Sequence, residues 1–233
     1  MLNPLANVAI YGFVFGVLFG ATAPRGQNSD LQSFALFMLC ALLPWTFFSL
    51  CMTLGLGAMT NNSALVRRVA FTREILVFSN VAHAIVQFLI ELALLSIILG
   101  LAGSPVLVHL PVTLVLIVLL AVFATGLSLA LSVLCVFFKD LAYLWAIVTQ
   151  VWFFLTPIVY SPTLLEDNLP NWSQRLIKMN PMVHFVAAFR DSLYHGQLPG
   201  VSRLVTLMIS SVFSLLAGWA VFLRMSRRLP EEV

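Results

Sequence analysis

The chain is dominated by apolar runs that are long enough to cross a membrane as helices. The hydrocarbon core of a bilayer, about 30 Å thick, needs roughly 20 apolar residues in a helix that rises about 1.5 Å per residue. Hydrophobic residues make up 61% of the 233 residues and charged residues only 9%, whereas soluble domains carry about 25% charged residues. We therefore predict an all-α polytopic membrane protein that forms one domain over residues 1–233. Six runs reach the required length: residues 2–20, 34–55, 76–100, 110–137, 141–160 and 204–223.

Three of these runs need further signals to be interpreted. The third and fourth belong to one charge-free stretch, residues 92–138, which is too long for a single span. Gly100–Pro105 carries the glycine, serine and proline residues of a turn, so we expect a helical hairpin there. The first run, followed by Ala21–Ala23, resembles a signal peptide with its cleavage site. Because no basic segment precedes it and it is long enough to span, we predict a membrane helix instead.

The positions of lysine and arginine indicate the orientation of the helices, because cytoplasmic loops carry an excess of these residues. With both termini in the cytoplasm, the short inner loops hold Arg67, Arg68, Arg73, Lys139, Arg224, Arg227 and Arg228. The longer outer segments hold Arg25, Arg175, Lys178, Arg190 and Arg203. We therefore predict both termini inside, an inner loop at residues 56–75 and an outer segment at residues 161–200. No basic stripe indicates a nucleic-acid partner.

The sequence contains no motif for binding ATP. A P-loop needs a lysine followed by serine or threonine, which meet the phosphates and the magnesium ion. The chain has two lysines, and neither is followed by such a residue: Lys139 and Lys178. Its three cysteines lie in apolar runs without the spacing of metal ligands: Cys40, Cys51 and Cys135. We expect no nucleotide, cofactor or metal bound by this chain, which is not an enzyme by itself. Another subunit must then drive any pumping.

The inner loop has the pattern of a short, cationic, amphipathic helix. Apolar Leu65, Val69 and Phe71 alternate with arginines between Asn61 and Leu76. Such a helix can be held by anionic lipid, at about 1 kcal/mol per cation. It can equally lie in a groove of a cytoplasmic partner, with apolar anchors at helical spacing. The periodicity alone leaves both possibilities open.

Several short motifs together carry a resemblance to a known family. They occur in this order: Leu43–Phe48, Arg67–Leu76, Phe138–Asp140, Phe153–Tyr160, Asn180–Pro181, Phe189–Arg190 and Glu231–Glu232. The ordered set resembles the permease subunit of ABC-2 type exporters, which move lipid-linked polysaccharides or teichoic acids out of bacteria. The resemblance covers nearly the whole chain. Family members usually place a basic, amphipathic interface helix before the first span, whereas this sequence starts almost inside that span at Leu2, which leaves both a shortened start and a real variant open.

The resemblance implies how this chain would work and with which partners. It implies a homodimer in the bacterial plasma membrane that passes a lipid-linked glycan of the O-antigen, capsule, galactan or teichoic acid type through the bilayer. A separate ABC subunit would bind ATP and magnesium and hydrolyse the ATP. The loop between spans two and three would dock on that ATPase, which favours docking over lipid binding. The residues implied in this coupling are Asn61, Leu65, Arg67, Arg68, Phe71, Arg73 and Glu74.

The resemblance also implies a translocation path and an external gate. The path would be lined by Trp45, Phe47, Phe48, Trp152, Phe153, Phe154 and Tyr160. Aromatic belts at membrane interfaces are the alternative explanation of these residues. Short helices after span five would form the gate, and its residues are Asn180, Pro181, Phe189 and Arg190. Asn180 is a good N-cap and Pro181 a good first residue for a helix that reaches about His195. The resemblance suggests a substrate phosphate near Arg190.

Other residues have more than one interpretation. Gly12, Gly16 and Gly20 share one helix face, which favours helix packing within the chain or the dimer. One acid lies inside a span, Glu91, with His83 and Gln87 on the same helix, and we expect a polar dimer or cavity contact. On the helix after Asn180, the apolar Met182, Phe185, Val186, Phe189 and Leu193 share one face. The opposite face holds His184, Asp191 and His195, which fit a wet interfacial face better than a metal site.

Other functional classes make different demands on the sequence. An ABC-2 drug or lipid exporter shares the architecture but usually lacks these motifs. An ion-driven secondary transporter predicts repeated, interrupted helices around a midplane ion site, and none is evident. A membrane enzyme acting on lipid-linked sugars needs converging carboxylates or a metal cluster, whereas only one acid, Glu91, lies inside a predicted span.

Overall fold

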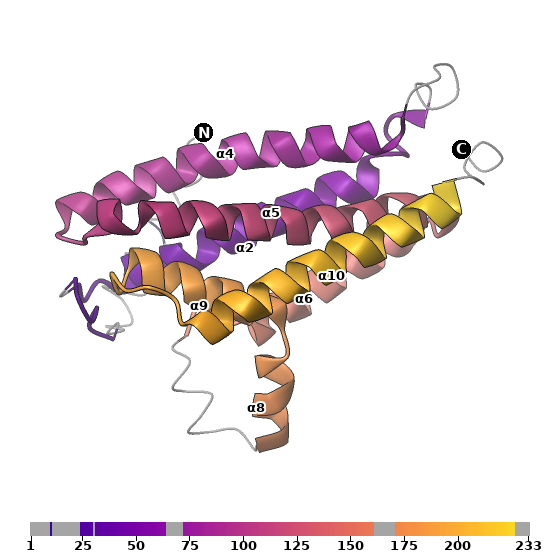
Figure 1. Ribbon diagram of the computed structural model, residues 1–233. Coiled ribbons are helices and arrows are strands. Elements are labelled where there is room, and N and C mark those ends of the chain that lie inside the picture. Colours follow the sequence, from indigo (N-terminus) through magenta and orange to yellow (C-terminus); the bar gives the residue numbers. More distant parts are fainter. Residues whose placement is uncertain (1–9, 11–23, 30, 64–71, 161–170, 227–233) are drawn as a thin grey trace. The chain divides into compact units, whose positions relative to one another are not determined.

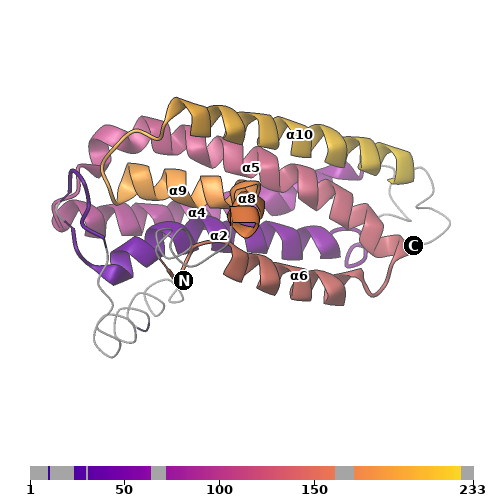
Figure 2. The same ribbon diagram turned by 90° about the horizontal axis from the view of Figure 1, so that it is seen from below.

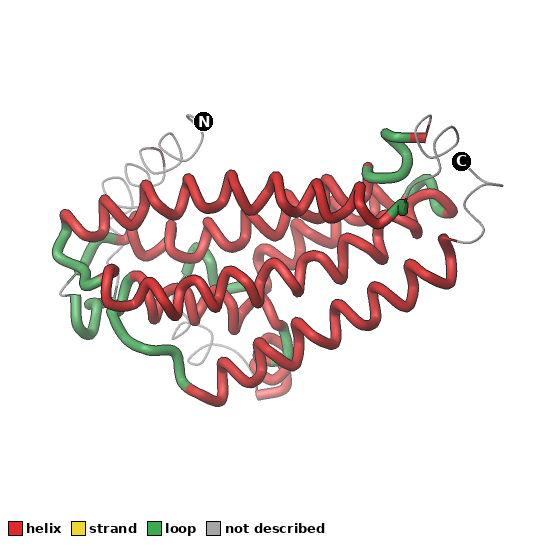
Figure 3. The backbone as a smooth tube through the Cα atoms, turned by 45° about the horizontal axis from the view of Figure 1, so that its top comes forward, coloured by secondary structure: helices red, strands yellow, loops and turns green. Residues whose placement is uncertain are grey.

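The computed structural model describes residues 10, 24–29, 31–63, 72–160 and 171–226, and these form helices joined by loops and turns (Figures 1 and 3). The helices are α2 (Phe34–Gly57), α4 (Glu74–Leu101), α5 (Val106–Phe137), α6 (Leu141–Leu155), α8 (Asn171–Lys178), α9 (Pro181–Leu193) and α10 (Val201–Ser226). Within this part of the chain the predicted all-α class is confirmed.

Four helices among the described residues are long and apolar enough to cross a membrane: α2, α4, α5 and α10. They coincide with the predicted runs 34–55, 76–100, 110–137 and 204–223 to within a few residues. The chain is a multi-pass membrane protein. The first predicted span, with Gly12, Gly16 and Gly20, lies outside the described residues, so the count of six spans stays a prediction.

The fifth predicted span is shorter than the sequence suggested. α6 ends at Leu155, whereas the apolar run continues to Tyr160. Pro157 has no backbone N–H and disfavours helical geometry at Thr156, which favours an end of the helix here, although α2 and α5 continue through Pro44 and Pro111. The chain turns instead, and the backbone N–H of Ile158 donates to the carbonyl of Thr156 at 2.7 Å. The prediction of a span over residues 141–160 was therefore wrong at its C-terminal end.

The chain divides into two compact units, each assembled from three separate segments. Unit 1 contains residues 1–45, 88–117 and 153–207, and unit 2 contains residues 46–87, 118–152 and 208–233. This division does not test whether residues 1–233 fold as one domain, so the single domain stays a prediction.

In unit 1 the predicted hairpin joins α4 to α5. Gly103 adopts a positive φ of 96°, which glycine reaches without steric cost. The backbone N–H of Ser104 donates to the carbonyl of Leu99 at 2.9 Å, which closes the end of α4. The hydroxyl of Ser104 donates to the carbonyl of Leu193 at 2.9 Å and so joins the hairpin to the end of α9. The expected turn at Gly100–Pro105 is confirmed.

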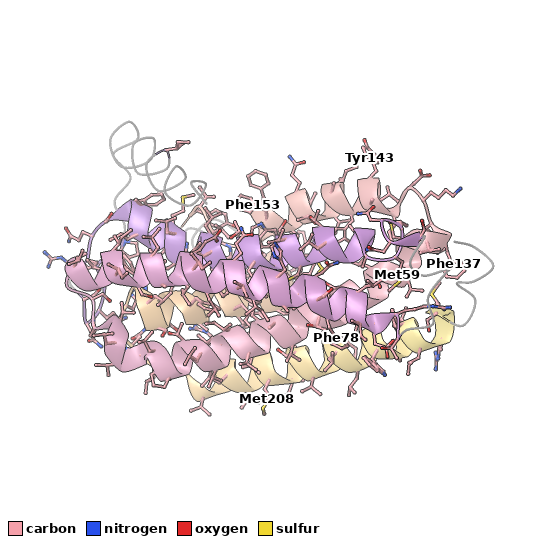
Figure 4. All side chains as sticks on the ribbon, turned by 90° about the horizontal axis from the view of Figure 1, so that it is seen from above. Met59, Phe78, Phe137, Tyr143, Phe153 and Met208 are labelled. Atoms are coloured by element: carbon pink, nitrogen blue, oxygen red, sulfur yellow. The ribbon has the colours of Figure 1, made fainter. Side chains whose placement is uncertain are left out.

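In unit 2 the helices pack around a cluster of buried apolar residues: Ala58, Met59, Val77, Leu129, Val133, Val136 and Phe222. The labelled Met59 and Phe137 lie at one end of this unit in Figure 4. α5 and α10 approach closely, because a Cβ at Gly218 would lie 1.8 Å from the carbonyl oxygen of Gly126. The Ser214 hydroxyl donates to the carbonyl of Phe123 at 2.8 Å across the same contact. Small residues and interhelical hydrogen bonds are typical of membrane helix packing.

Candidate functional site

A partly open cavity of about 510 Å³ lies in unit 2, between the second half of α2 and the first three turns of α6. Figures 2 and 4 show this part of α6 alongside α2. The lining residues are Ser49, Thr53, Leu56, Gly57, Thr60, Asn61, Cys135, Ala142, Trp145, Ala146 and Thr149. Among these described residues none carries a formal charge, and five have a hydroxyl or an amide group.

The polar groups of α2 form a stripe along the cavity. Ser49, Thr53 and Gly57 follow one another at intervals of four residues on one face of α2, and Thr60 lines the cavity from the turn that follows the helix. The Thr53 hydroxyl donates to the carbonyl of Ser49 at 3.0 Å and can still accept a hydrogen bond. The hydroxyls of Ser49 and Thr53 in an otherwise apolar helix therefore line the cavity that separates α2 from α6.

The facing side of α6 supplies small residues, a threonine and a tryptophan. Ala142, Trp145, Ala146 and Thr149 follow at intervals of three, one and three residues, again on one face. The two alanines leave the space that the cavity occupies. The indole Nε1 of Trp145 is buried and has no hydrogen-bond partner among the described residues. Tyr143, on another side of α6, projects outward and is 73% exposed (Figure 4).

A series of aromatic contacts leads from the cavity along α6 within unit 2. The ring centroids of Trp145 and Trp152 are 6.4 Å apart, and those of Trp152 and Phe48 are 5.1 Å apart, both in edge-to-face geometry. Phe48 in turn stacks on Phe123 at 5.9 Å. Two predicted path residues, Trp152 and Phe48, are therefore brought together, with Phe48 fully buried.

The other predicted path residues lie in different environments. Trp45 and Phe47 are buried, and the Trp45 ring packs edge to face on Phe153 at 5.6 Å. Phe154 is 63% exposed, and its carbonyl accepts a hydrogen bond from the Tyr160 hydroxyl at 2.7 Å. Among the aromatic residues proposed for the path, Trp45, Phe47 and Phe48 thus fill the interior of the chain, whereas Phe154 faces outward.

The predicted coupling loop is described only at its two ends. Asn61 lines the cavity, and its amide lies against Gly57, where a Cβ would be 2.5 Å from Nδ2. Glu74 begins α4, and the Arg73 guanidinium donates to the carbonyl of Ser226 at the end of α10. Leu65, Arg67, Arg68 and Phe71 lie outside the described residues.

Arg190 of the predicted gate is a buried cation whose donors face backbone carbonyls. Nε donates to the carbonyl of Phe37 at 3.2 Å, Nη1 to that of Pro157 at 2.5 Å and Nη2 to that of Ile158 at 2.7 Å. The guanidinium carbon lies 3.8 Å from the centroid of the Phe37 ring. Burial lowers the pKa of Arg190 to about 10, opposed by Cys40 and Tyr160. A side chain that is only 3% exposed does not present its charge to a substrate phosphate, so the suggested phosphate contact is not supported.

The remaining gate residues fold as the sequence predicted. The Asn180 side chain accepts a hydrogen bond from the N–H of Met182 at 3.0 Å, and Pro181 is the first residue of α9. α9 ends at Leu193, two residues before the predicted His195. Phe189 is fully buried and packs edge to face on Phe88 at 6.0 Å.

The polar face of α9 is occupied by local contacts. Asp191 forms an ion pair with Arg203 of α10, and its second oxygen accepts from Gln197 at 3.1 Å. The His184 Nε2 lies 2.7 Å from the carbonyl of Lys178. No group of His, Cys, Asp or Glu in the described part of the chain could hold a metal ion. Elsewhere, Glu91 is half-buried in α4 and His83 and Gln87 are exposed.

Sequence reasoning missed the polar stripe that faces the cavity. Its signal was available, because Ser49 and Thr53 stand four residues apart inside an apolar run. Thr149 is the matching polar residue on α6.

Comparisons with known proteins place the chain in a family. Residues 1–194 match the family described as "ABC-2 type transporter". The chain is 27% identical over 222 residues to the O-antigen export system permease protein RfbA of Myxococcus xanthus, covering 95% of this chain and 81% of that protein. Two proteins of the same name from Klebsiella pneumoniae are 25% and 24% identical over 230 residues, covering 98% of this chain and 84% of each.

The family match agrees with the sequence motifs and with the apolar helices. Its members are transmembrane subunits without ATPase activity, which fits a chain that lacks a P-loop motif. The resemblance drawn from the ordered motifs is confirmed. This chain belongs to the ABC-2 type transporter family.

Proposed function

We propose that this chain is the permease subunit of an ABC exporter that moves an O-antigen-type, lipid-linked polysaccharide across the bacterial plasma membrane. The observation that carries the proposal is similarity over 95% or more of the chain to three permeases whose names specify O-antigen export. Four long apolar helices supply the membrane part. Two copies of the chain form the pathway in this proposal, with both termini in the cytoplasm.

In this proposal a separate ATPase drives the permease through residues 56–75. Two contacts in unit 2 support the assignment. Arg73, at the end of the loop, is bonded to the last residue of α10. The Asn80 side chain, near the start of α4, donates to the carbonyl of Leu54 in α2 at 3.0 Å. A movement of the loop is therefore passed to three helices of unit 2, because each helix moves as a rigid element.

The outer segment 161–200 acts as the external gate in this proposal. Arg190 serves it as a structural clamp, since it bonds α9 to the carbonyls of Phe37 in α2 and of Pro157 and Ile158 after α6. Asn180 and Pro181 fix the start of α9, and Phe189 anchors it in the interior of unit 1. The exposed Phe154, together with Trp152, Phe153 and Tyr160, would guide the sugar chain. Aromatic faces give a sliding polymer weak, unspecific contacts rather than one fixed site.

Co-purification with the ATPase tests the coupling assignment. The double change Arg68→Glu and Phe71→Glu removes one cationic and one apolar anchor from the loop, so recovery of the ATPase with a tagged permease should fall at least tenfold. Arg224→Glu is the matched control, because Arg224 is an exposed arginine in the last turn of α10 rather than in the loop. Full recovery of the ATPase with the double variant would refute the role of residues 56–75.

A drug or lipid exporter of the same family would behave differently in a cell. Loss of a polysaccharide exporter leaves completed lipid-linked polymer inside the cell and removes it from the surface. Loss of a drug exporter leaves the surface polymer unchanged and lowers resistance to the exported compound. Immunoblots of surface and internal polysaccharide from a deletion strain therefore separate the two functions.

A further inference from the structure

We propose that the cavity between α2 and α6 is a binding site for an uncharged sugar unit of the exported glycan. The proposal deepens the exporter function proposed above and rests on it. It is carried by the polar stripe of α2, by the unpartnered indole N–H of Trp145 and by the lack of charge on the lining residues.

The polar groups of the cavity lie where α2 and α6 adjoin the predicted inner loops. Lipid tails offer no hydrogen bonds, so polar side chains at membrane depth face protein or a polar cavity. Ser49 and Thr53 lie in the last turns of α2 and line the cavity, and Thr60 and Asn61 line it from the start of the predicted inner loop. Trp145 adds a buried donor without a partner among the described residues, and leaving a buried hydrogen bond unmade is unfavourable. A ligand that both donates and accepts hydrogen bonds satisfies these groups.

The chemistry of the lining selects for hydroxyl groups rather than for phosphate. A sugar hydroxyl donates one hydrogen bond and accepts others, as do the hydroxyls of Ser49, Thr53, Thr60 and Thr149. A phosphate brings a charge whose burial needs a cationic partner, and the described lining offers none. An alkyl chain makes no hydrogen bond to any polar group of the lining. The aromatic ring of Trp145 provides a flat apolar face against which the C–H groups of a sugar ring can pack.

The size and the place of the cavity agree with a sugar occupant. Its volume of about 510 Å³ lies within the roughly 300–1,000 Å³ of small-ligand sites. Trp145 stands at one end of the aromatic series that continues through Trp152 to Phe48. Asn61, which the coupling assignment gives to the ATPase loop, also lines the cavity. A bound sugar therefore contacts the segment on which the ATPase acts.

Fluorine NMR of the complete complex tests the site. The permease and its ATPase partner are labelled with 5-fluorotryptophan and placed in nanodiscs, and the Trp145 signal is identified by its absence in Trp145→Phe. The probe is the polysaccharide of the host, freed from its lipid by mild acid. Its addition should shift the Trp145 signal and leave that of Trp219 unchanged, because Trp219 packs on Phe78 away from the cavity lining.

Two isosteric variants measure the contribution of the hydroxyls. Thr53→Val and Thr149→Val should each raise the polysaccharide concentration at half-maximal shift roughly 2- to 12-fold, the loss expected for one hydrogen bond. Thr206→Val is the matched control and should leave it unchanged. The Thr206 hydroxyl also donates to the carbonyl four residues earlier, at 3.0 Å in an apolar helix, but it does not line the cavity.

The outcomes separate this site from the exporter function on which it rests. A Trp145 signal that does not move with polysaccharide, or equal midpoints for Thr53→Val, Thr149→Val and Thr206→Val, overturns the sugar site even when cells export the polymer normally. The same shift with a sugar-free polyprenyl phosphate also overturns it, in favour of a lipid site. A Trp145 shift in a protein whose deletion leaves surface polysaccharide unchanged supports the site and overturns the exporter function.

Discussion

At the scale of single residues, Arg190 holds three segments of unit 1 together. Its guanidinium bonds to carbonyls in α2 and in the turn after α6, and its central carbon lies over the Phe37 ring. Arginine suits this position because its planar group carries five N–H donors in a fixed fork. The hydrogen bonds of the buried cation hold α9 against α2 and against the turn after α6.

Replacing this arginine by lysine should destabilise unit 1. Lysine keeps the charge, but its single ammonium group cannot reach carbonyls on two sides, so at least one charged hydrogen bond is lost, at about 1.5–3 kcal/mol. Thermal unfolding in nanodiscs should show a lower midpoint for Arg190→Lys. Arg224→Lys, at an exposed position, should change the midpoint little. Equal midpoints for the two variants would contradict the clamp.

Stability should also depend on the protonation of His195. Burial lowers the pKa of His195, Asp191 opposes this effect and Arg190 adds to it. The unfolded chain, with a histidine pKa of about 6.5, therefore takes up the proton first as the pH falls. The contribution of His195 to the free energy of unfolding is therefore fully present above the pKa of the unfolded chain. It declines as the pH falls below that pKa and stops declining once the pH is below the lower pKa of the folded state.

The contribution of His195 can be measured as a difference between two proteins. Between pH 7.5 and pH 5.5 the unfolding midpoint of the wild type should fall more than that of His195→Gln, which has no proton to gain. Other titrating groups are common to both proteins and cancel. Parallel pH profiles would show that the histidine is not held in its neutral form by the fold.

At the scale of elements, α5 and α10 meet at a contact that admits only glycine. A Cβ at Gly218 would lie 1.8 Å from a backbone oxygen of α5, and backbone cannot move aside as a flexible side chain can. Ser214 and Ser211 add hydrogen bonds to the carbonyls of Phe123 and Leu119 at 2.8 Å each. This contact fixes the distance between the two helices within unit 2.

Alanine at Gly218 should therefore separate α10 from α5. The variant should have a lower unfolding midpoint and a smaller yield of monodisperse protein than the wild type. Gly100→Ala is the control, since a Cβ at Gly100 meets nothing within 4 Å and alanine favours the helix. A Gly218→Ala protein as stable as Gly100→Ala would show that the two helices are free to move apart.

The sequence predicted elements better than contacts. Long apolar runs located α2, α4, α5 and α10, because length and hydropathy alone decide whether a helix can span. Asn180 and Pro181 located the start of α9, because capping is a local effect. The end of α6 was missed, since hydropathy continues past Pro157 whereas helical hydrogen bonding does not. The glycine contact of α5 with α10 was also missed, because it joins residues 126 and 218.

At the scale of the whole molecule, the sequence motifs predicted the family, and the family match confirms it. The candidate site was predictable only in part. The aromatic residues were visible in the sequence, but which of them are buried depends on packing between distant segments, as for Trp45 and Phe48. The cavity depends on hydroxyls of α2 and alanines of α6 that carry no signal until the two helices are side by side.

The central claim is that this chain exports a lipid-linked polysaccharide and that ATP hydrolysis in a separate subunit drives the export. The most direct test deletes its gene in the host and measures surface polysaccharide by immunoblot, with the gene restored in wild-type form or as Arg68→Glu with Phe71→Glu. The proposed function predicts loss of the surface polymer and its accumulation inside the cell. The wild-type gene should restore the surface polymer and the double variant should not. Surface polysaccharide at the normal level in the deletion strain would contradict the claim.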